Sequence, residues 1–288
     1  MANTIGTSTL SEVQRIEYAQ SKLDLTLRSA VVAEKICKVD RSPSRYIANP
    51  YLTALNANVA AIAGTYTVDT ATTVDDTLTV SEQVESAVHL YEFEDTLCRS
   101  DLFGSFMDDM TACVAEKVDY YVLNKLCSDS TGTYNTPPGG FATASNVNKI
   151  FSELIGKVAG YSDGRKGYFL VIENTDLPGL IESGAASGFS FADATLNNGF
   201  SGSLMGVDVY VVRSGTFATA TIGNLSAANS GKRLFGVKGV ATYAAPRGIQ
   251  YDEKKVTQKT GREIAIWANI GAKCWYHKTG LLVLITLA

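Results

Sequence analysis

FGSFMDDMTACVAEKVDYYVLNKL, residues 103–126, runs through 24 residues without proline and with a single glycine. Apolar residues recur at every fourth position across it: Leu102, Phe106, Met110, Val114, Val118, Val122 and Leu126. This spacing predicts a helix from an N-cap at Ser100 to Cys127, about 42 Å long at 1.5 Å per residue. Each four-residue step leads the helical turn by about 40°, so the stripe winds around the axis. The helix should therefore meet different neighbours at its two ends and act as a strut.

Composition indicates a globular chain. At 288 residues and 45% hydrophobic content it can bury a sizeable core, as one elaborate domain or two subdomains. No run reaches the roughly 18 apolar residues of a membrane span, so we expect no membrane association. The N-terminal MANTIGTSTLSEVQ lacks the basic and apolar regions of a signal peptide, which predicts assembly in the cytoplasm.

The five cysteines do not form a recognisable framework, because no C-x-x-C pair occurs. Cys98 and Cys113, if both lay on one helix, would stand about 22 Å apart along it, beyond disulfide reach. We therefore predict buried free thiols at all five positions: Cys37, Cys98, Cys113, Cys127 and Cys274.

Charge is distributed unevenly along the chain, although the net charge is only −4. Residues 51–130 carry 3 Lys/Arg against 14 Asp/Glu, whereas residues 231–288 carry 10 against 3. Solvated faces of opposite sign would explain this, and so would contact between the acidic face of one copy and the basic segment of another. Nucleic acid is a weaker explanation for the basic segment, because the chain as a whole is acidic.

The N-terminal third combines helical, extended and β patterns. Residues 10–36 read as one or two short helices, and the proline-marked 42–51 reads as extended. Residues 52–91 alternate as β structure, with Leu78, Val80, Val84, Val88 and Leu90 inward. Between them, Gly64 to Thr77 is Thr-rich, acidic and nearly devoid of large apolar groups. A hairpin of that composition cannot bury itself on its own core and should project towards a partner.

After the long helix the pattern is α+β without internal repeats. We predict a helix over 145–160 with Ser145 as N-cap and Gly160 at its end, and a short helix over 175–183. The predicted strands are residues 168–174, 203–212, 233–245, 262–277 and 281–288. Two long loops, 184–202 and 214–232, separate them. The small residues of 214–232 would allow several copies to approach closely around a symmetry axis.

Side chains suited to chemistry are scarce. His89 and His277 each stand alone among strand residues, and no hydrolase, phosphate-loop or clustered Cys/His motif occurs. The glycine-rich 160–167 and 199–206 read as turns. Adjacent acids occur at Asp108 with Asp109 and at Glu92, Glu94 and Asp95, where a weak divalent-ion site remains an alternative to a solvated or subunit-facing surface.

The order of these elements carries a resemblance. HLYEFEDTLCRSD (89–101) leads into a helix ending AEKVDYYVLNKL (115–126), followed by LMGVDVYVV (204–212) and IAIWANIGAKCWY (264–276). Across essentially the whole chain this resembles tailed-phage major capsid proteins of the HK97 fold. The resemblance implies an N-terminal arm (1–51), an extended hairpin loop (52–90), a peripheral domain with the spine helix (91–140 and 247–288) and an axial domain (141–246).

The resemblance also implies a function without catalysis, cofactor or metal. Subunits would assemble in the host cytoplasm into pentamers and hexamers of an icosahedral virion shell around double-stranded DNA. Scaffolding, portal and decoration proteins are implied as further partners. The sequence departs from relatives with a long cleaved N-terminal extension, which predicts separate scaffolding or none. Residues 64–77 contain no lysine, so the cross-linking chemistry of some relatives is not carried over.

Candidate inter-subunit contacts follow from the hairpin and the charge blocks: Gly64, Asp69, Asp75, Asp76, Asp108, Asp109, Lys254, Lys255 and Lys259. Two alternatives stay open. One is a nanocompartment shell of the same fold, for which the sequence reveals no cargo-docking groove. The other is a metal-dependent enzyme that uses the acidic cluster from Glu92 to Asp95.

Overall fold

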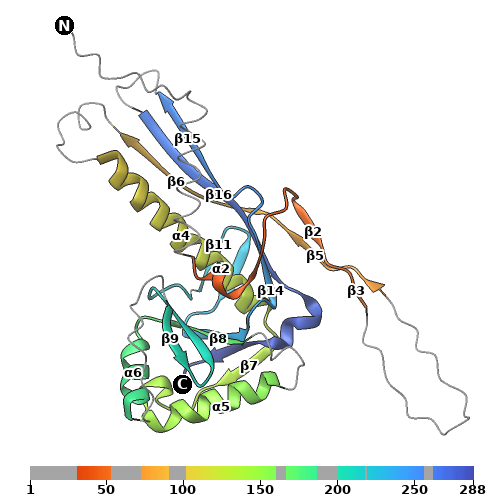
Figure 1. The fold of residues 1–288 in the computed structure, drawn as a ribbon, viewed down its shortest axis with the longest axis vertical. Helices are drawn as coiled ribbons and strands as arrows, with labels where there is room; N and C mark the ends of the chain where they lie inside the picture. Colours follow the sequence, from red (N-terminus) through yellow and green to blue (C-terminus); the bar gives the residue numbers. More distant parts are fainter. Residues whose placement is uncertain are drawn as a thin grey trace, which may run out of the picture.

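The computed structural model describes residues 31–52, 73–90, 102–159, 167–186, 200–217, 219–255 and 262–288. Figure 1 shows these residues as an elongated molecule. A long sheet with one long helix beside it occupies one end, and a second sheet with two helices occupies the other. One continuous hydrophobic core runs through both parts.

The long sheet is built around one strand, β16 (Arg262–Cys274). Its first nine residues pair antiparallel with β6 (Glu82–Leu90). On the other edge, residues 262–268 pair antiparallel with β15 (Ile249–Lys255). Its last four pair with β14 (Ala241–Ala244), which lies parallel to β1 (Lys38–Asp40). Ile264, Ile266, Ala268 and Ile270 are buried at every second position, so one face of the sheet is apolar.

That apolar face packs against α4 (Leu102–Asp129), the predicted long helix. The predicted stripe is confirmed at Met110, Val114, Val118, Val122 and Leu126, which are all buried. The prediction of two sets of neighbours is also confirmed: α4 contacts β16 and β6 along the sheet, and additionally α2 (Ala33–Ile36), β12 (Leu225–Ala228) and β17 (Leu282–Thr286). The predicted cap Ser100 lies outside the described residues.

The second sheet is mixed and has the order β7-β17-β13-β8-β10-β9. Its remaining strands are β7 (Gly132–Asn135), β13 (Lys232–Val237), β8 (Tyr168–Glu173), β10 (Val207–Val212) and β9 (Phe200–Leu204). The helices α5 (Ala144–Ala159) and α6 (Leu177–Ala186) pack against each other beside it, with η1 (Gly140–Ala142) next to α6. A 3-10 turn, η4 (Tyr276–Leu281), connects β16 to β17 and so joins the two sheets.

Two predicted single strands were wrong, because each contains a turn. Residues 203–212 form part of β9 and then β10, joined at Met205 (φ 53°) and Gly206 (φ 78°), as a primed hairpin turn requires. Residues 233–245 form β13 and β14, and the turn at Gly239 (φ 71°) sends the chain from the mixed sheet into the long sheet.

Two further local predictions need correction. The predicted loop 214–232 contains an antiparallel hairpin, β11 (Thr219–Ile222) with β12, which turns at Gly223 (φ 57°). Ser145 does not precede α5 but lies in its first turn, since the helix begins at Ala144. Gly160, its predicted end, is outside the described residues.

Candidate assembly surfaces

A two-stranded ribbon projects from the body of the molecule. β2 (Tyr46–Ala48) pairs antiparallel with β5 (Thr77–Thr79), and β3 (Tyr51–Leu52) with β4 (Thr73–Val74). Figure 1 shows the ribbon leaving the long sheet and pointing away from both helical layers. Its outer strands therefore have little of their own subunit to pack against. The described part of the predicted hairpin, residues 73–77, belongs to this ribbon, and residues 64–72 lie outside the described residues.

Where the ribbon joins the body, a small hydrophobic cluster anchors it. Leu78, Val80, Ala244 and Trp275 are buried together, apart from the main core, and Ile47 packs against them. We call this cluster the ribbon root. Trp275 is 6% exposed, and its indole Nε1–H donates to Thr242 Oγ1 at 2.9 Å. The root thus joins both ribbon strands to the long sheet by apolar contact.

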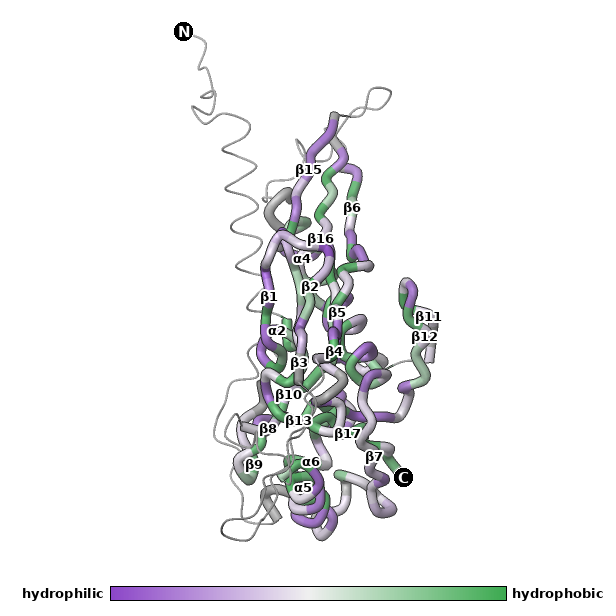
Figure 2. Tube along the Cα trace, turned by 90° about the vertical axis from the view of Figure 1, so that its right-hand side faces the viewer, coloured by the Kyte–Doolittle hydropathy of each residue, from purple (hydrophilic) through white to green (hydrophobic). Residues whose placement is uncertain are grey.

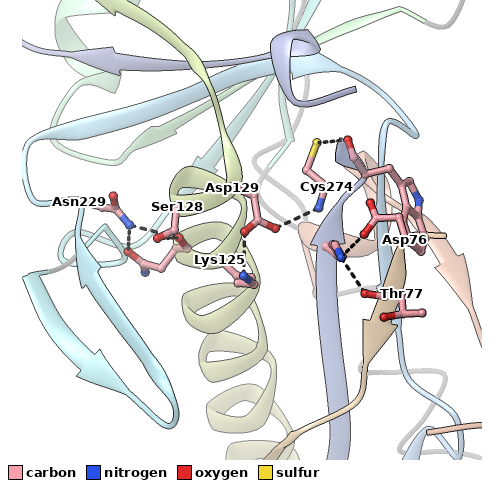
Figure 3. A network of polar contacts seen from close by, with 10 residues as sticks. Asp76, Thr77, Lys125, Ser128, Asp129, Asn229 and Cys274 are labelled. Carbon is pink, nitrogen blue, oxygen red and sulfur yellow. Dashed lines mark hydrogen bonds and ion pairs between the residues drawn. The ribbon is translucent and has the colours of Figure 1, made fainter. Parts of the chain in front are cut away.

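Polar contacts from the end of β16 hold the root from the other side. The Lys273 ammonium forms an ion pair with Asp76 and donates to the Thr77 carbonyl at 2.7 Å (Figure 3). A Cβ at Gly271 would stand 2.8 Å from the Thr79 carbonyl oxygen, so the ribbon crosses β16 at a point that only glycine permits. Together these contacts fix the direction in which the ribbon leaves the subunit.

The last turns of α4 form a polar hub that links the root to the hairpin β11–β12. Asp129 accepts from the Cys274 backbone N–H at 3.1 Å and from Lys125 at 2.7 Å (Figure 3). On the opposite side, buried Asn124 donates to the Thr216 carbonyl at 2.7 Å and accepts from Asn229 at 3.1 Å. Ribbon, strut and hairpin are therefore connected through hydrogen bonds at one helix end.

A buried ion cluster in the mixed sheet holds the chain just before the hairpin β11–β12. Arg233 is 4% exposed and forms ion pairs with Glu173 at 3.1 Å and with Asp176. The Glu173 carboxylate also accepts from the backbone N–H groups of Gly215 at 2.9 Å and Phe217 at 3.2 Å. Because each buried charge is paired and hydrogen-bonded, the cluster fixes the segment rather than destabilising the core.

A second buried carboxylate holds the chain that precedes the ribbon. Asp119, in the middle of α4, accepts from the backbone N–H groups of Val32 at 2.9 Å and Ala33 at 2.8 Å. These are the groups at the start of α2 that lack partners within that short helix. Burial raises the pKa of Asp119 to about 7, and the two hydrogen bonds lower it only in part.

The exposed side of α4 is acidic near the beginning of the helix. Asp108 and Asp109 are exposed, and Glu116 pairs with Arg213 at 2.9 Å. Cys113 is exposed on this side, so the prediction that it is buried was wrong, because it lies one position before Val114 and points off the stripe. The buried free thiols Cys37, Cys127 and Cys274 are confirmed, and Cys98 lies outside the described residues.

No family model and no curated protein matches the sequence. Solved structures do match over nearly the whole chain. The capsid of the cyanophage P-SCSP1u aligns with a TM-score of 0.69 at 11% identity, covering 91% of this chain and 89% of that chain. The capsid of the empty GTA particle aligns at 0.66 and 13% identity, covering 91% of both chains. A virus-like particle from Pyrococcus furiosus aligns at 0.61 and 9% identity, covering 94% and 99%.

The chain has the fold of phage capsid proteins. This confirms the resemblance on which the sequence prediction was based. Within the capsid fold, residues of the ribbon, of α4 and of the open side of the long sheet are the candidates for contact between copies. Figure 2 shows hydrophilic residues along β15, an edge strand of the long sheet in the described part of the chain.

The predicted contact residues fall into three groups within this capsid fold. Asp75, Asp108 and Asp109 are exposed. Asp76 and Lys254 already have partners in their own chain, Lys273 and, at 3.1 Å, Asp252. Residues whose side chains lie outside the description are Gly64, Asp69, Lys255 and Lys259. For all nine, contact between subunits stays a prediction.

Sequence reasoning missed the residues that hold the ribbon. The sequence pattern placed Lys273 and Trp275 within a predicted strand and gave them no further role. A charged and an aromatic side chain near the end of a buried strand can indicate that another segment is anchored there. Asp119 was missed as well; a lone acid next to Val118 in an apolar stripe was its signal.

Other predicted features can be placed only in part. The acidic cluster Glu92–Asp95 lies outside the described residues, and those described contain no group of three or more potential metal ligands. His89 lies on β6, with its Nδ1 atom 3.8 Å from the Glu263 carboxylate. Among the described helices, none combines the length and hydropathy needed to cross a bilayer.

Proposed function

We propose that this protein is the major capsid protein of a tailed phage, assembling as pentamers and hexamers into an icosahedral shell around double-stranded DNA. The capsid fold along about nine tenths of the chain supports this proposal. Assembly in the host cytoplasm, with scaffolding, portal or decoration proteins as additional partners, belongs to the same proposal. It includes no catalytic role, no cofactor and no metal.

The observation that carries the proposal is the projecting ribbon. Its root is anchored by apolar contacts, an ion pair and a close backbone crossing, whereas Tyr46 and Val74 remain 61% and 38% exposed. A monomeric protein would gain nothing from a rigidly directed but unburied arm. In a shell, such an arm overlaps a neighbour, and many modest contacts sum to a stable assembly.

We retain the division into arm (1–51), extended loop (52–90), peripheral domain (91–140 and 247–288) and axial domain (141–246) as part of the proposal. Sheet membership refines it at three points. Residues 31–36 pack into the main core, so a free arm would end before them. The ribbon begins at Tyr46 rather than at residue 52. β17 pairs with β13 of the proposed axial domain, and β7 joins the same sheet by pairing with β17.

A second candidate is a nanocompartment shell without a phage genome. The match that spans 99% of the Pyrococcus furiosus virus-like particle chain supports this alternative. The two candidates share the subunit and its self-assembly and differ in contents. Particles purified from an infected host would contain protected double-stranded DNA in the first case and a protein cargo in the second.

Deleting residues 66–75 tests the proposal. The variant should remain folded by circular dichroism, because the ribbon root starts at Leu78 and lies outside the deletion. Negative-stain electron microscopy of the wild-type protein should show closed shells or ring-shaped oligomers, and the variant should show no closed shells. Normal shells from the variant would reduce the ribbon to a surface loop, and a wild-type protein that stays monomeric would overturn the function.

A further inference from the structure

A polar groove lies beside the ribbon, where it joins the long sheet. It has a volume of about 390 Å³ and is lined by residues 43–45 before the ribbon strand β2, by residues 80–83 between β5 and the start of β6, by Pro246 with Arg247 in the β14–β15 connection, and by Asn269 of β16. Because the same backbone that fixes the ribbon forms its walls, the groove is a preformed feature of the subunit.

Two arginines give this groove a positive charge. Arg45 and Arg247 are both exposed, and within the described part of the chain neither guanidinium has a carboxylate within ion-pair distance. Arg45 stacks on the ring of Tyr46, 5.8 Å from its centroid. The one acid of the groove, Glu82, is occupied by Asn224 Nδ2 at 2.8 Å and Ser81 Oγ at 3.1 Å. Arginine beside an exposed tyrosine is a composition typical of binding hot spots.

A matching pair of negative charges stands elsewhere on the subunit. Asp108 and Asp109 are neighbours in the second turn of α4, both exposed and both without an ion pair to any described residue. Among the described residues no cation offsets their mutual repulsion. Bidentate guanidinium–carboxylate contacts would satisfy both sets of charges at once.

The two surfaces lie on opposite sides of the subunit. α4 begins on the side of the long sheet away from the ribbon, and the groove lies at the ribbon (Figure 1). A subunit therefore cannot place its own Asp108 in its own groove. Two different patches on opposite sides of one chain can meet only head to tail, and head-to-tail contacts that close generate rings.

We propose that the Arg45–Arg247 groove receives Asp108 and Asp109 from a second copy of this chain. The contact rests on the proposed function, since it supplies one of the interfaces that a ring of subunits needs. It also assigns specific cations to Asp108 and Asp109 on the acidic face of α4, in addition to the C-terminal lysines predicted from the sequence.

Charge exchange between full-length variants tests this contact. A groove variant carries Arg45→Glu with Arg247→Glu, and a helix variant carries Asp108→Lys with Asp109→Lys. Each alone places like charges in the contact and should weaken self-association by roughly tenfold to a hundredfold, as measured by light scattering on a sizing column. Lys149→Glu serves as control, because Lys149 is an exposed residue on α5 with only a weak 4.0 Å pair to Glu153.

Mixing the two variants gives the decisive result. In an equimolar mixture each groove variant meets a helix variant on both sides, so every contact is again between opposite charges, and oligomers with equal numbers of each chain should reappear. A single chain carrying all four substitutions should also self-associate. Restoration by neither route, or wild-type association of the groove variant, overturns the contact. If the groove variant assembles normally and loses only DNA retention, the groove is a phosphate site and the contact is again overturned. A wild-type protein that remains monomeric overturns the proposed function itself.

Discussion

Replacing Trp275 by Ala should release the ribbon while the body of the subunit stays folded. Trp275 is the largest member of the ribbon root, which is separate from the main core. Removing a buried tryptophan side chain costs about 3–5 kcal/mol, and the Thr242 hydroxyl additionally loses its indole donor. Because the lost contacts belong to the root, most of this energy should be lost from local opening of the ribbon rather than from global unfolding.

Hydrogen exchange measures that local opening. The Val80 N–H donates to the Arg45 carbonyl at 2.9 Å and the Asn49 N–H to the Asp76 carbonyl at 2.8 Å, so both amides report on the root. A loss of about 3 kcal/mol should accelerate their exchange by roughly a hundredfold. Amides in the middle of α4 should exchange at the wild-type rate.

The second tryptophan of the chain provides the control. Trp267 lies on β16, the strand that ends immediately before Trp275, but it is half-buried on the face opposite α4 and does not belong to the root cluster. Trp267→Ala should leave exchange at Val80 and Asn49 unchanged. Equal protection of these amides in the wild type and in Trp275→Ala would refute the argument that the indole anchors the ribbon.

Three further predictions follow from the buried and exposed charges. Burial raises the pKa of Asp119 to about 7 in the folded protein, whereas the carboxyl of the unfolded chain already loses its proton near pH 4. The free energy of unfolding should therefore fall as pH rises from about 4 to 7, by at most about 4 kcal/mol. Asp119→Asn should flatten this part of a profile of melting temperature against pH. Arg233→Met leaves two buried carboxylates without their cation and should destabilise the subunit by about 3–5 kcal/mol in urea denaturation. Reversing Lys254, Lys255 and Lys259 to Glu together should slow assembly at low salt without unfolding the subunit; an unchanged assembly rate by light scattering would show that these lysines face solvent.

The parts of the fold that could be predicted from the sequence are those in which apolar residues recur with a single period. The four-residue spacing from Met110 to Leu126 reflects a helix with one continuous buried stripe, and the alternation from Ile264 to Ile270 reflects a strand covered on one face. Turns inside continuous apolar runs could not be predicted, as at Met205 and Gly206. The strands on both sides of this turn are buried, so the hydrophobic pattern does not change where the chain reverses direction.

The assembly surfaces were harder to predict, because they depend on pairs that are distant in sequence. The acidic side of α4 could be read from Asp108 and Asp109, since adjacent charges on a helix face solvent or a partner. The groove could not, because Arg45 and Arg247 are brought together only when the ribbon crosses β16. Local patterns carry no information about such a crossing, apart from the glycine at position 271 that permits it.

The salt dependence of assembly should separate two roles: anchoring of the ribbon within its own subunit, and recognition of a neighbouring subunit. A disordered arm would lose conformational entropy each time it bound a neighbour. A ribbon fixed at its root has already lost that entropy when the subunit folds. The root is held mainly by buried apolar groups, so Trp275→Ala should weaken assembly to a similar degree at low and at high salt. The contact through Arg45 lies at the surface, where charges are screened over about 8 Å at physiological ionic strength. Its contribution should therefore decline with added salt, and the association constants of the wild type and the groove variant should converge. If the groove variant differs from the wild type equally at all salt concentrations, its defect arises from a misplaced ribbon and not from lost charge pairing.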